Sequence, residues 1–166
     1  MSLMQTCADV EAVVARARSL FGGGEAVDVP SGAPSITSAA QAVVTARSRT
    51  SELTGVGATS YGEMADRSVP PLRTSAASDA GLTTHMTTAA AITQAGAARM
   101  EQIAAQTSAI AKAAPMAKSS ADQRVILTAL RSQVAQTAQV VQDSQHQASA
   151  LAGQLRGLQY PKDAPA

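Results

Sequence analysis

Residues 119–158, SSADQRVILTALRSQVAQTAQVVQDSQHQASALAGQLRGL, carry the strongest structural signal in the chain. Apolar and small side chains recur at alternating intervals of three and four residues, which places them along one stripe of a helix. No proline interrupts the stretch, and glycine occurs only near its end. The stripe comprises Leu127, Leu130, Val134, Thr137, Val141, Ser144, Ala148, Leu151, Leu155 and Leu158.

Two overlapping capping motifs mark the start of this helix. Ser120 is followed three residues later by Gln123, and Ser119 is followed three residues later by Asp122. In a capping box the serine hydroxyl and the later polar side chain each accept a backbone N–H of the first turn. A helix of about 40 residues would be roughly 60 Å long, and it would need partner helices against its stripe to be stable in water.

The N-terminal residues predict a short amphipathic helix followed by a linker. From Thr6 to Phe21 one face is apolar, with acidic residues near the start and arginines near the end, as the helix dipole favours. Residues 22–35 are rich in glycine and proline and predict a flexible linker. Three glycines also occur in phosphate-binding loops, but no Gly-Lys-Ser/Thr follows and no strand pattern precedes them.

The middle of the chain predicts two more long helices. The first begins after Ser35 and runs over residues 36–68, weakened by glycines around residues 54–60, where a break or kink is expected. Val69-Pro70-Pro71 predicts a helix boundary, because proline is tolerated at a helix start and not in its interior. The next helix is expected over residues 71–113, and Gly96 on its apolar stripe suits a close approach of another helix.

These patterns predict an all-α protein: an elongated antiparallel bundle of three long helices plus a short N-terminal helix. The expected organisation is an N-terminal amphipathic helix over residues 1–21 and a linker over 22–35. The bundle is expected over residues 36–158, and a flexible tail over 159–166.

Composition argues against several classes of partner. The formal net charge is +1, and the aromatic residues are one Phe and two Tyr, so neither an electrostatic nor a stacking platform for nucleic acid is expected. The chain has no apolar run of about 18 residues, hence no expected transmembrane helix, and no basic-then-apolar signal peptide at its start. Cys7 is the only cysteine and is expected to be a small buried hydrophobe.

No catalytic set is evident in the sequence. The carboxylates are scattered, and there is no Gly-x-Ser-x-Gly motif. His85 and His146 would come to a similar height if the last two helices fold back on each other, and with Asp143 they could bind zinc. They lack His-x-x-x-His or Glu-x-x-His spacing. We therefore expect no enzymatic activity, no cofactor and no small-molecule substrate, with a metal-dependent activity at these histidines as an alternative.

Three segments have a recognisable texture: ARARSLFGGG at residues 15–24, HMTTAAAITQAGAARMEQIAAQTSAIAKAA at 85–114, and the stretch from Ser119 to Tyr160. Together they resemble an uncharacterised Ala-rich helical domain of mycobacteria, which is found alone or fused ahead of NlpC-type peptidoglycan hydrolases. The resemblance implies a helical accessory protein of the cell envelope, with a connection to type VII (ESX) secretion. The Trp-x-Gly and Tyr-x-x-x-Asp/Glu motifs common in substrates of that system are missing, and so are counterparts of the catalytic residues of the hydrolases.

The expected sites are therefore surfaces rather than pockets. Apolar residues outside the predicted stripes could form a patch for another helix, from a partner protein or from a second copy. The candidate interaction residues are Val44, Val56, Ile92, Ile126 and Val140. A self-assembling coiled-coil scaffold is the structural alternative to a protein with a specific partner.

Overall fold

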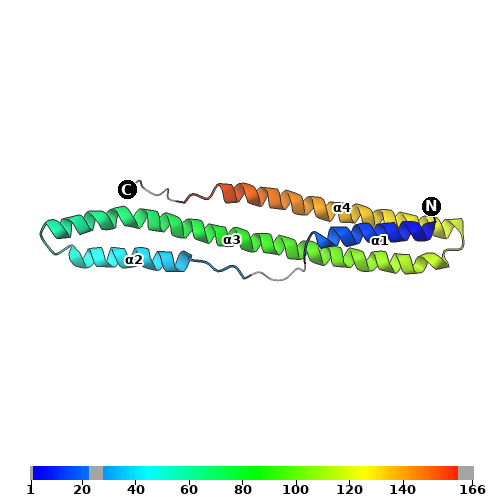
Figure 1. Ribbon diagram of the computed structural model, residues 1–166, viewed down its shortest axis with the longest axis horizontal. Coiled ribbons are helices and arrows are strands. Elements are labelled where there is room, and N and C mark those ends of the chain that lie inside the picture. The colour runs from blue at the N-terminus through cyan, green and yellow to red at the C-terminus, as the bar shows by residue number, and fades with distance from the viewer. Residues whose placement is uncertain (1, 23–27, 161–166) are drawn as a thin grey trace. The chain divides into compact units, whose positions relative to one another are not determined.

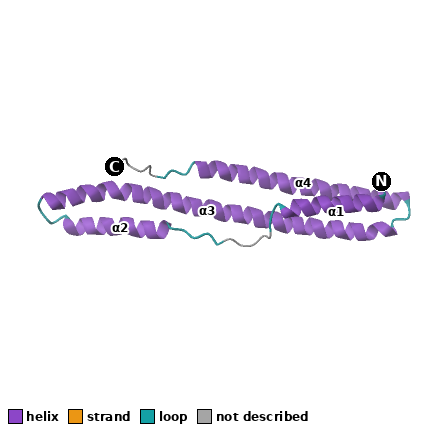
Figure 2. Cartoon of the chain, in the orientation of Figure 1, coloured by secondary structure: helices purple, strands orange, loops and turns teal. Residues whose placement is uncertain are grey.

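The computed structural model describes residues 2–22 and 28–160 (Figure 1). All regular structure in these residues is helical, as Figure 2 shows, so the predicted all-α class is confirmed. The helices are α1 (Leu3–Ser19), α2 (Ala33–Thr50), α3 (Val56–Ala113), the short 3₁₀ helix η1 (Ala114–Met116) and α4 (Ser120–Arg156). Part of the predicted linker, residues 23–27, lies outside the described residues, and α2 begins with Pro34 in its first turn.

The start of α4 uses the second of the two predicted capping motifs. The backbone N–H of Asp122 donates to Ser119 Oγ at 3.0 Å, and the backbone N–H of Ser119 donates to Asp122 Oδ2 at 3.1 Å. Hydrogen bonds with the side chain and backbone of Ser119 hold the pKa of the Asp122 carboxyl below its ordinary value. Ser119 is therefore the N-cap, and the exchange satisfies two groups of the first helical turn.

The predicted boundary at Pro70 and Pro71 is wrong, because α3 runs through both prolines. Proline has no N–H, so the carbonyls of Asp66 and Arg67 lose their helical donors four residues later. All four residues are exposed, so water can take up the freed carbonyls and the penalty stays small enough for the helix to continue.

The chain instead breaks at residues 51–55, within one turn of the weak point expected from the glycines. Gly55 has a φ of +131°, a backbone conformation that side chains with a Cβ rarely adopt. This glycine turn, and not the proline pair, separates α2 from α3. The lengths of the two helices therefore differ from the predicted ones, at 18 residues for α2 and 58 for α3.

The chain divides into two compact units. The first consists of Met1–Val27 and Thr88–Leu151, and the second of Asp28–Thr87 and Ala152–Ala166. In the first unit α1, the C-terminal half of α3 and α4 enclose two apolar clusters. One contains Val14, Ala17, Phe21, Met100, Ile103 and Val140, and the other contains Cys7, Ala114 and Leu130.

The stripe predicted for α4 is half correct. Leu130, Thr137 and Leu151 are buried as expected, but Val134 is 37% exposed. Gln133 and Val140 are buried in place of the predicted Val134 and Val141 positions. The clusters against which α4 packs include residues of both α1 and α3. At two positions the buried residue is therefore the one directly before the predicted residue.

Gly96 lies in a close contact, as its position on the predicted stripe suggested. A Cβ at this position would stand 2.2 Å from Cε1 and 2.4 Å from Cδ1 of Phe21. The Phe21 ring follows the end of α1, and the exposed Gly22 after it has a φ of +62°. An ion pair of 2.6 Å between Arg18 and Glu101 also joins α1 to α3. Both of its side chains are mostly exposed, so it contributes little beside the apolar contact.

The second unit has a different interior. Among its described residues, the buried ones are all small: Ala33, Ala40, Ala65, Ala76 and Ser78. We call α2 together with residues 56–77 of α3 the helix pair. Arg47 of α2 and Asp66 of α3 form an ion pair of 2.6 Å across it.

The chain beyond α4 also contacts α3 within this second unit. The Ser78 hydroxyl donates to the backbone carbonyl of Gln159, and Leu158 lies against Gly81. The predicted tail over 159–166 thus begins with a residue whose carbonyl is bound to α3, although Gln159 itself is exposed, and residues 161–166 lie outside the described residues. Among the helices described, none has a stretch long and apolar enough to cross a membrane.

Candidate functional site

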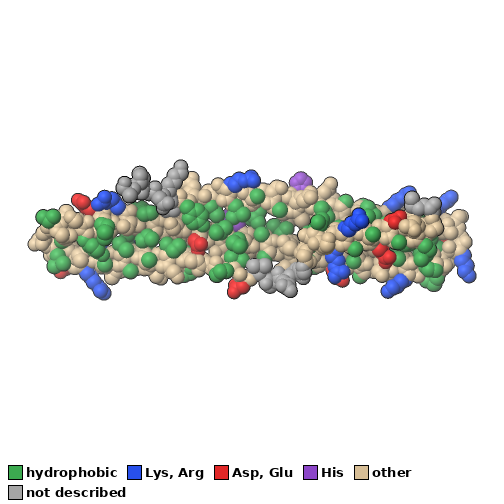
Figure 3. Space-filling model, viewed as in Figure 1, with side chains coloured by type: hydrophobic (Ala, Val, Ile, Leu, Met, Phe, Trp, Pro, Cys, Tyr) green, Lys and Arg blue, Asp and Glu red, His purple; other side chains and the backbone are tan. Residues whose placement is uncertain are grey.

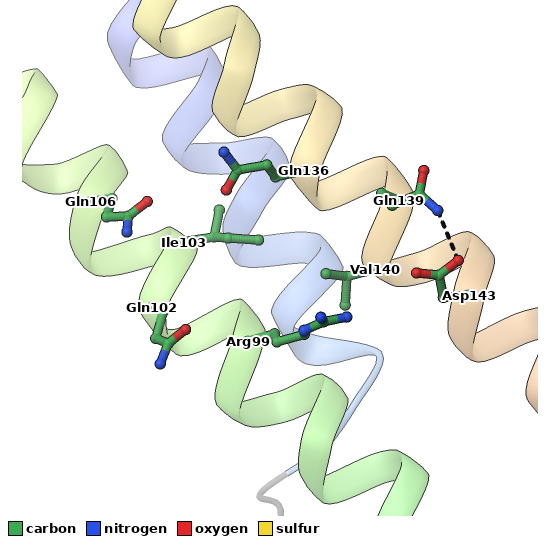
Figure 4. A pocket seen from close by; sticks show the side chains of 8 residues that line it. All are labelled: Arg99, Gln102, Ile103, Gln106, Gln136, Gln139, Val140 and Asp143. Carbon is green, nitrogen blue, oxygen red and sulfur yellow. Dashed lines mark hydrogen bonds between the residues drawn. The ribbon is translucent and has the colours of Figure 1, made fainter.

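A shallow groove lies between α3 and α4 in the first unit and has a volume of about 300 Å³. Its floor is formed by the core residues Ile103 and Val140. The rim is polar, as Figure 4 shows. Arg99, Gln102 and Gln106 come from α3, and Gln136, Gln139 and Asp143 from α4.

The polar groups of this groove can form hydrogen bonds. The Gln139 amide donates to Asp143 Oδ1 at 2.8 Å along α4, and Arg99 extends toward α4. Glutamine amides both donate and accept hydrogen bonds but do not act as acids or bases near neutral pH. Among the residues that the structure describes, no serine, cysteine or histidine lines this groove.

A polar layer crosses the interior of the same unit. Thr107, Gln133 and Thr137 are buried, and along α3 and α4 they lie between members of the two apolar clusters. The two threonine hydroxyls donate back to the carbonyls of Ile103 and Gln133, at 2.8 and 2.9 Å. Oε1 of Gln133 is buried without a hydrogen-bond partner.

This layer overturns one expectation from the sequence. The stripe predicted for α4 leaves Gln133 outward, so that its replacement by alanine should have almost no effect on stability. With only 7% of Gln133 exposed, that substitution instead alters the core. A polar residue in a helical core commonly fixes register at some expense of stability.

The five predicted interaction residues do not form one exposed patch. Val140 is a core residue at 7% exposure, and Ile126 packs half-buried against the cluster of Cys7, Ala114 and Leu130. Ile92 is half-buried at a small cavity beside Gly96 and Val140. Thus the three candidates in the first unit mainly serve its own packing.

The other two candidates belong to the second unit. Val44 is half-buried on α2, and Val56, the first residue of α3, is 85% exposed. Sequence reasoning missed other large exposed side chains near Val56, notably Leu53 and Met64. The exposure of Leu53 could have been expected from its position directly before the glycine-rich break, because a residue outside a helix is not buried by a helical stripe.

The histidine hypothesis gains no support. His85 is half-buried on α3 and His146 is exposed on α4. Within residues 2–22 and 28–160, no three or more His, Cys, Asp or Glu side chains gather in an arrangement that could hold a metal ion.

Cys7 has the environment of a structural thiol. Its side chain is buried with Ala114 and Leu130. Burial, and to a lesser degree the charge of Glu11, raises the pKa of the thiol above its ordinary value. A raised pKa disfavours the thiolate, which is the reactive form. Cys7 is therefore buried as a small hydrophobe, as expected from the sequence.

Comparisons with protein-family models, curated protein sequences and solved structures found no match to this chain.

Proposed function

We propose that this protein is a non-enzymatic helical interaction protein. The observation that carries the proposal is the distribution of its few large apolar residues. Leu20, Leu53, Val56, Met116 and Val125 are each more than half exposed, although the chain has few large hydrophobic side chains with which to build cores. These side chains lie at or near helix ends, and exposed apolar side chains favour docking of other helices.

The helices are proposed to run antiparallel, as a bundle. The order of contacts in the first unit supports this arrangement. Arg18 pairs with Glu101, the later Phe21 meets the earlier Gly96, and the early Cys7 shares a cluster with Ala114. As residue numbers rise from Cys7 to Phe21, the numbers of their partners fall from Ala114 to Gly96.

The biological setting proposed is the actinobacterial cell envelope, as a partner of a peptidoglycan hydrolase or of type VII secretion. Its support is the resemblance of residues 15–24, 85–114 and 119–160 to the Ala-rich mycobacterial domain. A self-assembling scaffold is the second candidate. A formal net charge of +1 favours it, because copies of the chain would not repel each other strongly.

Affinity capture from an actinobacterial envelope extract, beside a muropeptide-release assay, tests this proposal. We expect the full chain to retain a defined protein partner, or itself, and to release no muropeptides from purified peptidoglycan. Release of muropeptides would overturn the non-enzymatic assignment. A chain that is monomeric at all concentrations and retains no protein would overturn the interaction role.

A further inference from the structure

We propose that the end of the first unit at which α3 turns into α4 docks on the surface of an anionic lipid bilayer. This inference goes beyond the proposed protein partner. The formal net charge of +1 hides an uneven distribution, because residues 102–142 contain four Lys or Arg side chains and a single acidic one, Asp122. We call the surface formed by these four cations and the two large apolar side chains among them the basic end: Lys112, Met116, Lys118, Arg124, Val125 and Arg131.

The cations of the basic end are available to an outside partner. All four side chains are exposed. The ion pairs of residues 2–22 and 28–160 involve Arg18, Arg47 and Arg67, so a carboxylate of the described chain neutralises none of the four. The single acid of this region is committed to the N-cap of α4, where Asp122 Oδ2 accepts the backbone N–H of Ser119.

The acidic residues of α1 lie away from this turn. Glu11 lines a small cavity with Thr107, which is about two helical turns before η1. Asp9 accepts a hydrogen bond from Gln5 along α1. The first turn of α1, which lies closer to the turn because α1 contacts η1, carries the uncharged Met4 at 53% exposure. The positive charge of the basic end is therefore not cancelled by α1.

Large apolar side chains lie among these cations without being part of the core. Met116, the last residue of η1, is 72% exposed, and Val125 near the start of α4 is 69% exposed. Directly beneath, Ala114 and Leu130 are buried with Cys7, so the turn is held on a packed cluster. Figure 3 shows Lys and Arg side chains at this end of the first unit, with hydrophobic side chains among them.

Residue spacing places part of the basic end on one outer face of α4. Arg124, Thr128 and Arg131 are separated by four and three residues and are all exposed, whereas Leu130 on the inner face is buried. Val125 flanks this face, and the turn before α4 adds further exposed side chains. Cations and apolar groups can therefore meet one extended surface together.

An anionic bilayer fits both kinds of side chain. Its phosphates pair with Lys and Arg, and the boundary between headgroups and acyl chains accepts Met and Val. Nucleic acid also offers phosphates, but it binds apolar and aromatic side chains chiefly by stacking, and residues 102–142 contain no Phe, Tyr or Trp. The combination of unpaired cations with exposed aliphatic side chains therefore favours lipid over nucleic acid.

Flotation of the full chain with lipid vesicles tests the proposal. We expect binding to vesicles of phosphatidylcholine mixed with phosphatidylglycerol, and none to vesicles of phosphatidylcholine alone. Each cation near an anionic surface strengthens binding about fivefold, so Lys118→Gln with Arg124→Gln should weaken it about 20- to 30-fold. Added salt should weaken binding of the parent as well, because it screens these charges.

A matched double variant separates the basic end from net charge. Arg16→Gln with Arg49→Gln removes the same charge from two exposed arginines outside the basic end and should leave vesicle binding nearly unchanged. Met116→Ser should weaken binding by about fivefold without altering its salt dependence, because it removes only apolar contact. Circular dichroism melts establish that the variants remain folded.

A fluorescent label reports which residues enter the bilayer. Cys7 is 2% exposed, so an environment-sensitive dye attaches selectively to the new thiol of a Met116→Cys variant. Its emission should shift to the blue on addition of anionic vesicles. The same dye in a Leu53→Cys variant is the control, since Leu53 is 63% exposed and belongs to the second unit, and its emission should not shift.

The outcomes separate this inference from the proposed function. Equal binding to both kinds of vesicle overturns it, and so does an equal loss in the two double variants, because net charge alone would then explain binding. Tighter binding to duplex DNA than to anionic vesicles overturns lipid as the partner. Absence of vesicle binding overturns the inference but leaves the proposed function standing, because capture of a protein partner requires no lipid.

Discussion

Replacing Gly96 by alanine sets two opposing effects against each other. Alanine is the better helix former by about 1 kcal/mol, so the substitution should stabilise α3 if there were room for it. The new Cβ would lie 2.2 Å from Cε1 of Phe21, far inside van der Waals contact. The ring is 7% exposed and belongs to the main apolar cluster, so it cannot move without loosening that cluster.

The clash with Phe21 should outweigh the gain in helix propensity. Overpacking a filled core costs about 1–3 kcal/mol, and complete loss of a buried phenylalanine costs about 3–5 kcal/mol. We expect Gly96→Ala to lower the unfolding free energy by about 1–2 kcal/mol after the gain in helix propensity is counted. For a chain of this size that corresponds to a fall in Tm of about 2–8 °C.

A double-mutant cycle isolates the contact. In a Phe21→Ala background the obstacle is gone, so Gly96→Ala should now stabilise by up to about 1 kcal/mol. Gly153→Ala is the control, because a Cβ at Gly153 meets nothing within 4 Å and should be neutral or stabilising in both backgrounds. Urea unfolding followed by circular dichroism supplies the free energies. Equal stabilisation by Gly96→Ala with and without Phe21 would refute the contact.

Four other substitutions test the remaining parts of the first unit. Gln133→Met should raise the unfolding free energy by about 1 kcal/mol, because it removes a buried oxygen that has no partner; a loss in urea unfolding would mean that this oxygen is satisfied. Leu130→Ala and Leu151→Ala should each lower it by about 2–4 kcal/mol, since both side chains are buried, and melts equal to the parent would contradict their core positions. The lowered pKa of Asp122 predicts stability that is present above the pKa of the unfolded carboxyl and is lost as pH falls through the lower pKa of the folded one. Thermal melts over acidic pH should therefore show a smaller decline for Ser119→Ala than for the parent, and parallel curves would contradict the coupling.

The sequence was a good guide where local signals agree. The capping residues at Ser119 and Asp122, the helical class and the close approach at Gly96 all follow from spacing and residue type. The proline boundary failed because the cost of proline depends on whether freed carbonyls face water, which a sequence does not state. The glycine turn at Gly55 was the better place to break the chain.

The candidate site was harder to predict than the fold. Alanine, serine, threonine and glutamine dominate the helices, so hydropathy does not mark buried positions such as Gln133 and Thr137 apart from their exposed neighbours. The predicted stripe is narrow and suits contact with a single partner helix. The buried face of α4 instead contributes to clusters that also contain residues of α1 and α3. That difference moved Val140 from the expected surface into the core.

The proline pair also bears on how α3 opens. Pro70 and Pro71 lack an amide hydrogen, so two consecutive backbone hydrogen bonds are missing within the 58 residues of this helix. Each helical hydrogen bond stabilises the next one along the chain. Where two are missing, the part of the helix after the prolines does less to prevent fraying of the part before them. The amides of residues 56–69 should therefore exchange with solvent deuterium as a group of their own, ahead of those from Leu72 onward. A single continuous helix would in this way contain two segments that open independently.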